Sequence, residues 1–164
     1  MKDKVAFRER LLRMIIENPG LHFRELQRRT NSAIGKLDYH LYQLERDGKI
    51  ISRKDSENVR FFSNESGTIS DRKIAFYLRN KTGKDLLFSA LSNKSGVSSD
   101  LFAEKELNII KQMESDGIIE VIRDGKNVRF ELKDRGLFIA FLKKYGYSFI
   151  DSIALSILGL LDES

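Results

Sequence analysis

The chain of 164 residues contains no cysteine, no tryptophan, two histidines and a single proline. The absence of cysteine excludes disulfide bonds, cysteine-ligated zinc, iron–sulfur clusters and thiol nucleophiles. Because histidine occurs only as His22 and His40, a histidine-rich metal site is also excluded, and we expect neither a metal nor a cofactor. No run of about 18 uncharged apolar residues occurs, so a membrane span is not expected. The charged start of the chain does not resemble a signal peptide, and we expect a cytoplasmic protein.

Enzymatic motifs are also missing. The sequence has no phosphate-binding glycine loop, no zinc-protease motif and no hydrolase nucleophile elbow. His22 and Glu25 lie close in sequence, but no nucleophile accompanies them, so we do not expect an enzyme. The 41% of hydrophobic residues suffices for a packed core. Lysine and arginine number 29 against 24 acidic residues, and the resulting charge of +5 favours an anionic partner.

An internal repeat organises the chain. Residues 43–61 and 112–130 align without a gap at an offset of 69, and ten of the 19 positions are identical. In each copy a helical pattern ends at Asp-Gly, and two short apolar runs follow, separated by a polar turn. This order predicts a helix followed directly by a β-hairpin. A hairpin so short must pack on the helices that precede it.

The apolar spacing predicts three helices ahead of the first hairpin, over about Val5–Glu17, His22–Arg29 and Ala33–Asp47. In the third helix we expect four apolar side chains to face inward, namely Ile34, Leu37, Leu41 and Leu44. The first helix recurs in the second copy at an offset of 75. The second copy therefore lacks about six residues, which we assign to the turn at Thr30–Gly35. Further helices are predicted over about 71–80, 134–145 and 148–161.

Helix, helix, turn, helix and hairpin is the order of a winged helix domain. Residues 18–26 (NPGLHFREL) and 37–48 (LDYHLYQLERDG), with the hairpin that follows, resemble winged helix-turn-helix transcriptional regulators of the ArsR/MarR-like superfamily. The duplicated layout is similar to archaeal tandem winged-helix regulators. The resemblance implies a mainly α fold with small β-hairpins, an α+β class. Its parts would be a first winged-helix domain (1–67), a connecting helix with a second winged-helix domain (68–133), and C-terminal helices (134–164).

The resemblance implies double-stranded DNA as the partner. The third helix, about 33–47, would lie in the major groove, and the hairpin, about 50–62, would lie as a wing on the flanking backbone or in the minor groove. The predicted outward face of the third helix presents Ser32, Gly35, Lys36, Tyr39, His40 and Gln43. On the second helix and the wing, the candidate DNA-binding residues are Arg24, Arg28, Arg53, Lys54, Asn58 and Arg60.

Two of these residues have a structural alternative. His40 can pack against the wing instead of facing DNA, and Arg60, which recurs as Arg129, can pair with an acidic residue of its own hairpin. The second copy begins its third helix with Glu104-Lys105-Glu106, and carboxylates there would repel phosphate. We therefore expect the second copy to be mainly structural or to mediate association.

The last 19 residues contain no lysine or arginine. In them Ile150, Ile153, Ile157 and Leu160 follow helical spacing and form an apolar stripe that must be covered. We expect a homodimer interface there, with packing inside the monomer as the alternative, and the missing cations disfavour a membrane surface. For the whole chain, two alternatives to a regulator stay open. These are a tandem winged-helix scaffold that binds proteins, and a chromatin protein without sequence specificity.

Overall fold

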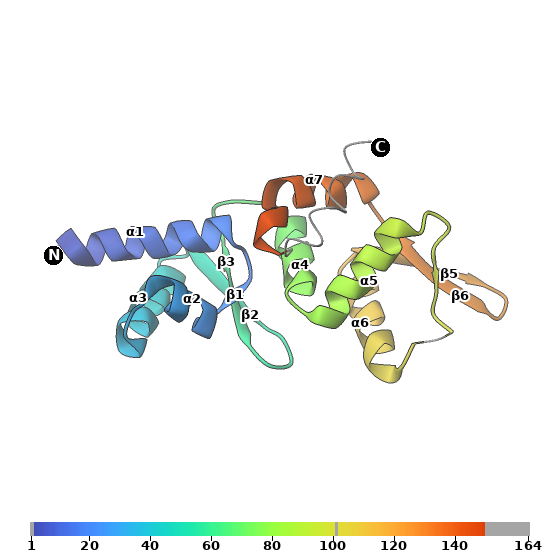
Figure 1. Ribbon diagram of the computed structural model, residues 1–164, viewed down its shortest axis with the longest axis horizontal. Coiled ribbons are helices and arrows are strands. Elements are labelled where there is room, and N and C mark those ends of the chain that lie inside the picture. The colour runs from blue at the N-terminus through green and yellow to red at the C-terminus, as the bar shows by residue number, and fades with distance from the viewer. Residues whose placement is uncertain (1, 101, 150–164) are drawn as a thin grey trace. The chain divides into compact units, whose positions relative to one another are not determined.

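The computed structural model describes residues 2–100 and 102–149, and these fall into two compact units, Met1–Arg72 and Lys73–Ser164. Each unit contains helices and one three-stranded antiparallel sheet (Figure 1). The α+β fold with small sheets, predicted from the repeat, is confirmed. None of the helices among these residues is both long and apolar enough to cross a membrane.

The first unit follows the predicted order of helices and adds a strand that we did not predict. Its elements are α1 (Lys2–Glu17), β1 (Leu21–His22), α2 (Phe23–Thr30), α3 (Ile34–Arg46), β2 (Ile50–Lys54) and β3 (Val59–Ser63). The sheet has the order β1-β3-β2, and Leu21 pairs with Phe61 across β1 and β3. The hairpin strand β3 is therefore the central strand of a sheet that also holds the segment before α2.

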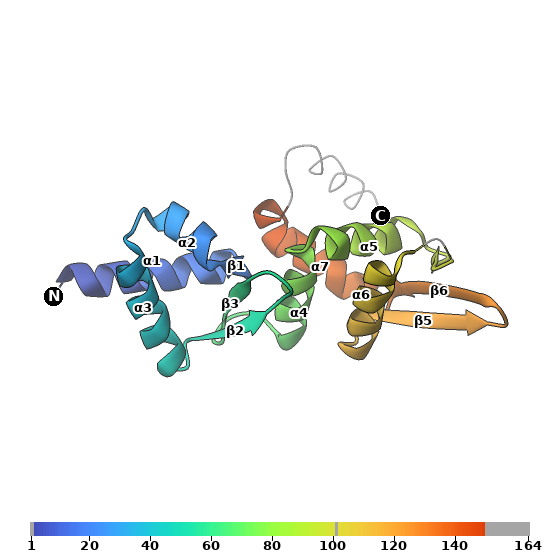
Figure 2. The same ribbon diagram turned by 90° about the horizontal axis from the view of Figure 1, so that it is seen from below.

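The core of the first unit lies between α1, α2, α3 and the sheet. The side chains of Leu11, Leu26 and Leu37 have no exposed surface, and Phe7 is only 4% exposed. Figure 1 shows α2 and α3 next to each other, and in both views the C-terminal end of α1 lies beside the sheet of its own unit (Figures 1 and 2). Pro19 and Gly20 end α1, and Gly20 adopts φ 84, which a residue with a side chain rarely does.

The second unit repeats this plan with one difference ahead of its third helix. It contains most of α4 (Ile69–Leu78), followed by α5 (Lys81–Ser92), β4 (Val97–Ser98), α6 (Glu104–Ser115), β5 (Ile119–Asp124), β6 (Asn127–Leu132) and α7 (Arg135–Tyr145). Its sheet has the order β4-β6-β5, which matches the first sheet strand for strand. Its third helix starts at Glu104, as predicted, and ends at Ser115, directly before the Asp-Gly pair that the repeat predicts as the end of the helix.

One prediction about the second copy is wrong. We expected it to lose only the turn between its second and third helices. Among the described residues between β4 and α6, which are Ser99, Asp100, Phe102 and Ala103, no helix is present. The counterpart of α2 is therefore the feature that these residues lack.

The end of the described chain packs within the second unit. The guanidinium of Arg79 donates to the carbonyl oxygen of Ser148 at 2.6 Å and lies 3.8 Å from the ring centroid of Phe149. A short 3₁₀ turn, Gly146–Ser148, links α7 to this contact. The predicted last helix and its stripe of Ile150, Ile153, Ile157 and Leu160 lie outside the described residues.

Candidate nucleic-acid interface

The helix α3 has one face in the core and one face in solvent. Leu37, Leu41 and Leu44 are at most 3% exposed and hold the helix against α1 and α2. Tyr39 and Tyr42 on the other face are 52% and 60% exposed. The ring of Tyr39 lies edge-on to that of His40 at a centroid distance of 5.3 Å, but about half of each tyrosine side chain is open to solvent. They are therefore available to contact a partner.

The predicted orientation of α3 was wrong at two positions. Ile34 was expected to face inward but is 63% exposed, whereas His40 was expected to face outward but is 4% exposed. Counting Ile34 as a core residue rotated the predicted face toward His40, since each residue advances the helix by about 100°. The leucines alone give the correct face.

His40 contributes to the packing between α3 and α1. Its ring centroid lies 4.9 Å from that of Phe7, and its Nδ1 atom is buried without a hydrogen-bond partner. Burial lowers the pKa of His40, and the positive charges of Lys36, Arg8 and Lys4 lower it further. Both effects favour the neutral imidazole. The alternative of a packing histidine is realised, but against α1 instead of the wing.

Several predicted contact residues lie on or beside the exposed surface. Gly35 and Lys36 are exposed at the start of α3, and the Nζ atom of Lys36 lies 4.3 Å from the ring centroid of Phe7. Gln43 is half-buried beside a cavity of about 140 Å³ that Lys4 and Arg8 also line. The amine of Lys36 is thus close to α1 in the free protein.

The turn before α3 is held by local hydrogen bonds. Asn31 adopts the left-handed conformation at φ 48 and ends α2. The hydroxyl of Thr30 lies 2.8 Å from that of Ser32 and donates to the carbonyl oxygen of Leu26 at 2.7 Å. Ser32 is half-buried in this turn, whereas Arg24 and Arg28 of α2 are at the surface. The turn fixes the angle at which α3 leaves α2.

An acidic residue organises the wing from inside. Asp55 accepts hydrogen bonds from the backbone N–H groups of Glu57 and Asn58, at 2.8 and 2.6 Å. The same carboxylate pairs with the guanidinium of Arg60, which also donates to the carbonyl oxygen of Gly20 at 3.2 Å. The two side chains of the pair are 9% and 7% exposed. Arg60 therefore has the structural role that we considered as its alternative.

The pKa of Asp55 reflects this environment. Burial raises the pKa, but the hydrogen bonds from the two backbone amides and the adjacent Arg60 guanidinium outweigh burial and leave the pKa below its ordinary value. The carboxylate is therefore charged at neutral pH. The turn it organises leaves Lys54 exposed and Arg53 and Asn58 half-buried.

Two residues of the exposed face were missed. Tyr42 and Arg46 are exposed, and together with Gly35 and Tyr39 they follow the 4-3-4 spacing of one side of a helix. Taking the face directly opposite Leu37, Leu41 and Leu44 would have identified both. We use the name reading face for Gly35, Tyr39, Tyr42 and Arg46.

The comparisons with known proteins agree with this geometry. Residues 5–74 match a family described as an N-terminal HTH domain. The chain is also 25% identical over 133 residues, 77% of its length, to an uncharacterized HTH-type transcriptional regulator of Methanocaldococcus jannaschii. The match spans 33% of that relative. The family match ends two residues after the first unit.

The described elements and the family match lead to the same assignment. In the first unit, α2, the turn at Asn31 and α3 form the helix-turn-helix, and the hairpin of β2 and β3 forms the wing. The first unit therefore has a winged helix-turn-helix fold, and residues 5–74 are similar to the family described as an N-terminal HTH domain.

Proposed function

We propose that the chain is a DNA-binding transcriptional regulator that inserts α3 into the major groove of double-stranded DNA. The observation that carries this proposal is the reading face, where Tyr39 and Tyr42 project from a helix that is otherwise fixed in the core. An α-helix fits the major groove, where base edges present a distinct pattern of donors and acceptors. A helix-turn-helix domain points to a role in binding, not in catalysis.

Gly35 supports a close approach of the helix to a partner. A Cβ atom at this position would have no neighbour within 4 Å, so the packing of the free protein does not require glycine. Glycine within a helix costs about 0.5–1 kcal/mol relative to alanine. A gain from bringing the backbone close to DNA would account for this cost.

The flanking contacts would go to phosphates. Arg24 and Arg28 on α2 and Lys54 on the wing are surface cations of the same unit. Contacts of this kind fix the position of a protein on DNA without reading bases. We do not include His40 and Arg60 in the proposed contact surface, because both side chains are buried.

The proposal is tested by selecting bound sequences from a random DNA pool and then measuring affinity for the selected site. Replacing Tyr39 and Tyr42 with alanine should weaken specific binding at least tenfold, since good base contacts are worth about 1–3 kcal/mol each. The matched control replaces the equivalent residues of α6, Asn108 and Lys111, and should leave affinity unchanged.

Unchanged binding by the tyrosine variant would remove α3 from the mechanism. A protein-interaction scaffold is the second candidate, because Ile34 is as exposed as the two tyrosines. In that case no sequence would be enriched, and any residual DNA binding would vary with salt but not with sequence.

A further inference from the structure

The second unit differs from the first at positions that fill the core of the first. At the offset of 75, Thr82 stands where Phe7 is buried. At the offset of 69, Glu106 stands where Leu37 has no exposed surface. The helix that covers this region in the first unit, α2, has no helical counterpart among the described residues. Among the described residues, the second unit therefore combines smaller or more polar side chains at these two positions with the lack of a helix like α2 over them.

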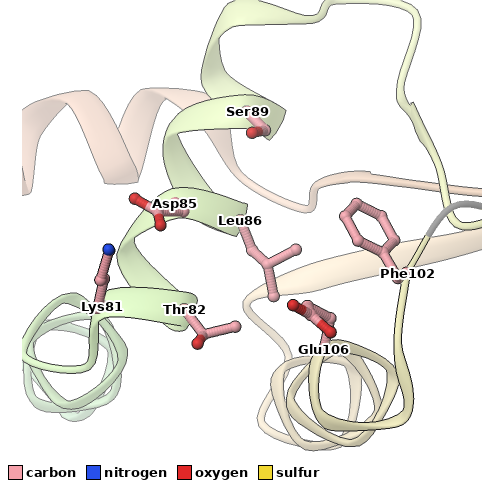
Figure 3. A pocket seen from close by; sticks show the side chains of 7 residues that line it. All are labelled: Lys81, Thr82, Asp85, Leu86, Ser89, Phe102 and Glu106. Carbon is pink, nitrogen blue, oxygen red and sulfur yellow. The ribbon is translucent and has the colours of Figure 1, made fainter.

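A cavity of about 330 Å³ lies at this place, between α5 and α6. Its size is at the lower end of the range for small-molecule sites, about 300–1,000 Å³. Figure 3 shows Thr82 and Leu86 of α5 facing Phe102 and Glu106 across the cavity. The ring of Phe102 is supported from behind by Phe130, at a centroid distance of 5.9 Å. Each wall of the cavity thus combines an apolar side chain, Leu86 or Phe102, with a carboxylate, Asp85 or Glu106.

Glu106 has an unmet requirement for a hydrogen-bond donor. Its Oε2 atom is buried and accepts no hydrogen bond. The residue is third in α6, where a glutamate can cap the helix, but the start of α6 has no side-chain cap. A buried acceptor without a donor destabilises a protein, and a donor from a ligand removes the penalty. The empty space beside Glu106 is where such a donor would enter.

The charges around the cavity favour a cation. Asp85 adds a second carboxylate on α5, and Lys81 is the only basic side chain among the described lining residues. An ammonium group can donate up to three hydrogen bonds and can also lie against an aromatic face. From this combination we infer that the cavity between α5 and α6 binds a small molecule with a protonated amine. The amine donates to Glu106, and the apolar part of the ligand contacts Phe102 and Leu86.

The inference is tested with benzylamine, benzyl alcohol and benzoate, which share a ring but differ in charge. Amide chemical shifts in a ¹⁵N-labelled full chain report binding. Benzylamine should shift the amides of residues 81–89 and 102–107 in a saturable way. Benzyl alcohol and benzoate should bind at least tenfold more weakly. Equal affinity for the alcohol, or no saturable shift with benzylamine, would overturn the inference.

Three variants separate the carboxylate from the cavity. Glu106→Gln should remove the preference for benzylamine over benzyl alcohol, since the charge is lost but the shape is kept. Glu106→Leu restores the residue of the first unit and should abolish binding of all three compounds while raising the melting temperature. Glu104→Gln, an exposed position on the same helix, is the control and should bind benzylamine like the wild type. Retention of benzylamine binding by Glu106→Leu would contradict the assignment. These readouts do not involve DNA, so failure here leaves the proposed function untouched.

Discussion

Arg60 and Arg129 occupy the same position of the repeated tetrapeptide but lie in different environments. Arg60 is 6% exposed and pairs with Asp55, whereas Arg129 is exposed. The cause is the length of the strand ladder. In the first hairpin the last pair is Lys54 with Val59, which leaves Asp55 in the turn. In the second the ladder continues to Asp124 and Asn127, so the aspartate belongs to a strand.

Replacing Asp55 with asparagine should destabilise the first unit at neutral pH by about 3 kcal/mol, because it leaves the buried Arg60 without its counter-charge. The folded state lowers the pKa of Asp55, so its contribution is present above the ordinary pKa of 3.8 and is lost as the pH falls below that value. Urea unfolding followed by circular dichroism across pH should show the difference between variant and wild type shrinking in acid.

A nearby exposed acid serves as the control for this prediction. Glu57→Gln, in the same turn, should change the free energy of unfolding by no more than about 0.5 kcal/mol at any pH. A loss for Asp55→Asn that persisted unchanged below the pKa of the folded state would show that the charge is not the source of the stability.

At the residue scale, periodicity predicted the buried leucines but not the ends of the stripe. Leu37, Leu41 and Leu44 are buried as expected. Ile34 lies in the first turn of α3, outside the core. The apolar pattern does not show how far along α3 the elements that cover its inner face extend. His40 was predicted to face outward because histidine does not count as an apolar residue in the periodic pattern. In the structure its ring packs against Phe7.

At the scale of the element, we predict that the wing contacts the DNA backbone through Arg53 and Lys54. Replacing Arg53 and Lys54 with alanine should weaken binding to all DNA sequences alike. The slope of log affinity against log salt should fall by about 0.9 for each phosphate that the variant no longer neutralises. Gel-shift titrations at several salt concentrations, with selected and random DNA, measure both quantities.

The second hairpin provides the comparison for the wing. Arg123 and Lys126 are exposed there, and the Nη1 atom of Arg123 lies 3.5 Å from the Oε1 atom of Glu114. Alanine at both positions should leave the salt slope unchanged if only the first wing contacts DNA. An effect confined to one DNA sequence in the Arg53 and Lys54 variant would instead mean that the first wing reads bases.

Among the elements, the long helices and both hairpins could be predicted, whereas the two-residue strands could not. Leu21–His22 and Val97–Ser98 are too short to show alternation, and they become strands only because β3 and β6 offer free edges. The described residues between β4 and α6 contain no counterpart of α2, and this difference appeared in the sequence as a change of offset. That change indicated the number of missing residues but not which element they came from.

At the scale of the whole molecule, the chain divides into two compact units, and α7 lies in the second. The division into parts 1–67, 68–133 and 134–164 stays a prediction. The buried aromatic residues of α7, Phe138, Phe141 and Tyr145, show no strict repeat with the first unit. Sequence comparison between copies could therefore not assign this helix to either of them.

Self-association is the prediction that belongs to this scale. The apolar stripe of Ile150, Ile153, Ile157 and Leu160 predicts a homodimer, because burying four such side chains contributes on the order of 6–10 kcal/mol before the cost of association. Sedimentation should show a dimeric wild type and a folded monomer for Ile153→Glu with Ile157→Glu. A wild type that stays monomeric at high concentration would rule out the dimer, and an unfolded variant would place the stripe inside the monomer.

The lack of a helix between β4 and α6, among the described residues, has a consequence for the length of DNA that one chain is proposed to cover. A chain with two similar units suggests a target with two adjacent copies of one short sequence. Because the described residues between β4 and α6 form no helix and α6 begins at Glu104, we expect α3 to be the one helix, among those described, that enters the groove. On the proposed function, the length of the recognised DNA sequence then increases with the number of chains that bind, not with the number of winged-helix units in each chain. An inverted repeat in the selected DNA would thus indicate two bound molecules, and a single short conserved sequence would indicate one.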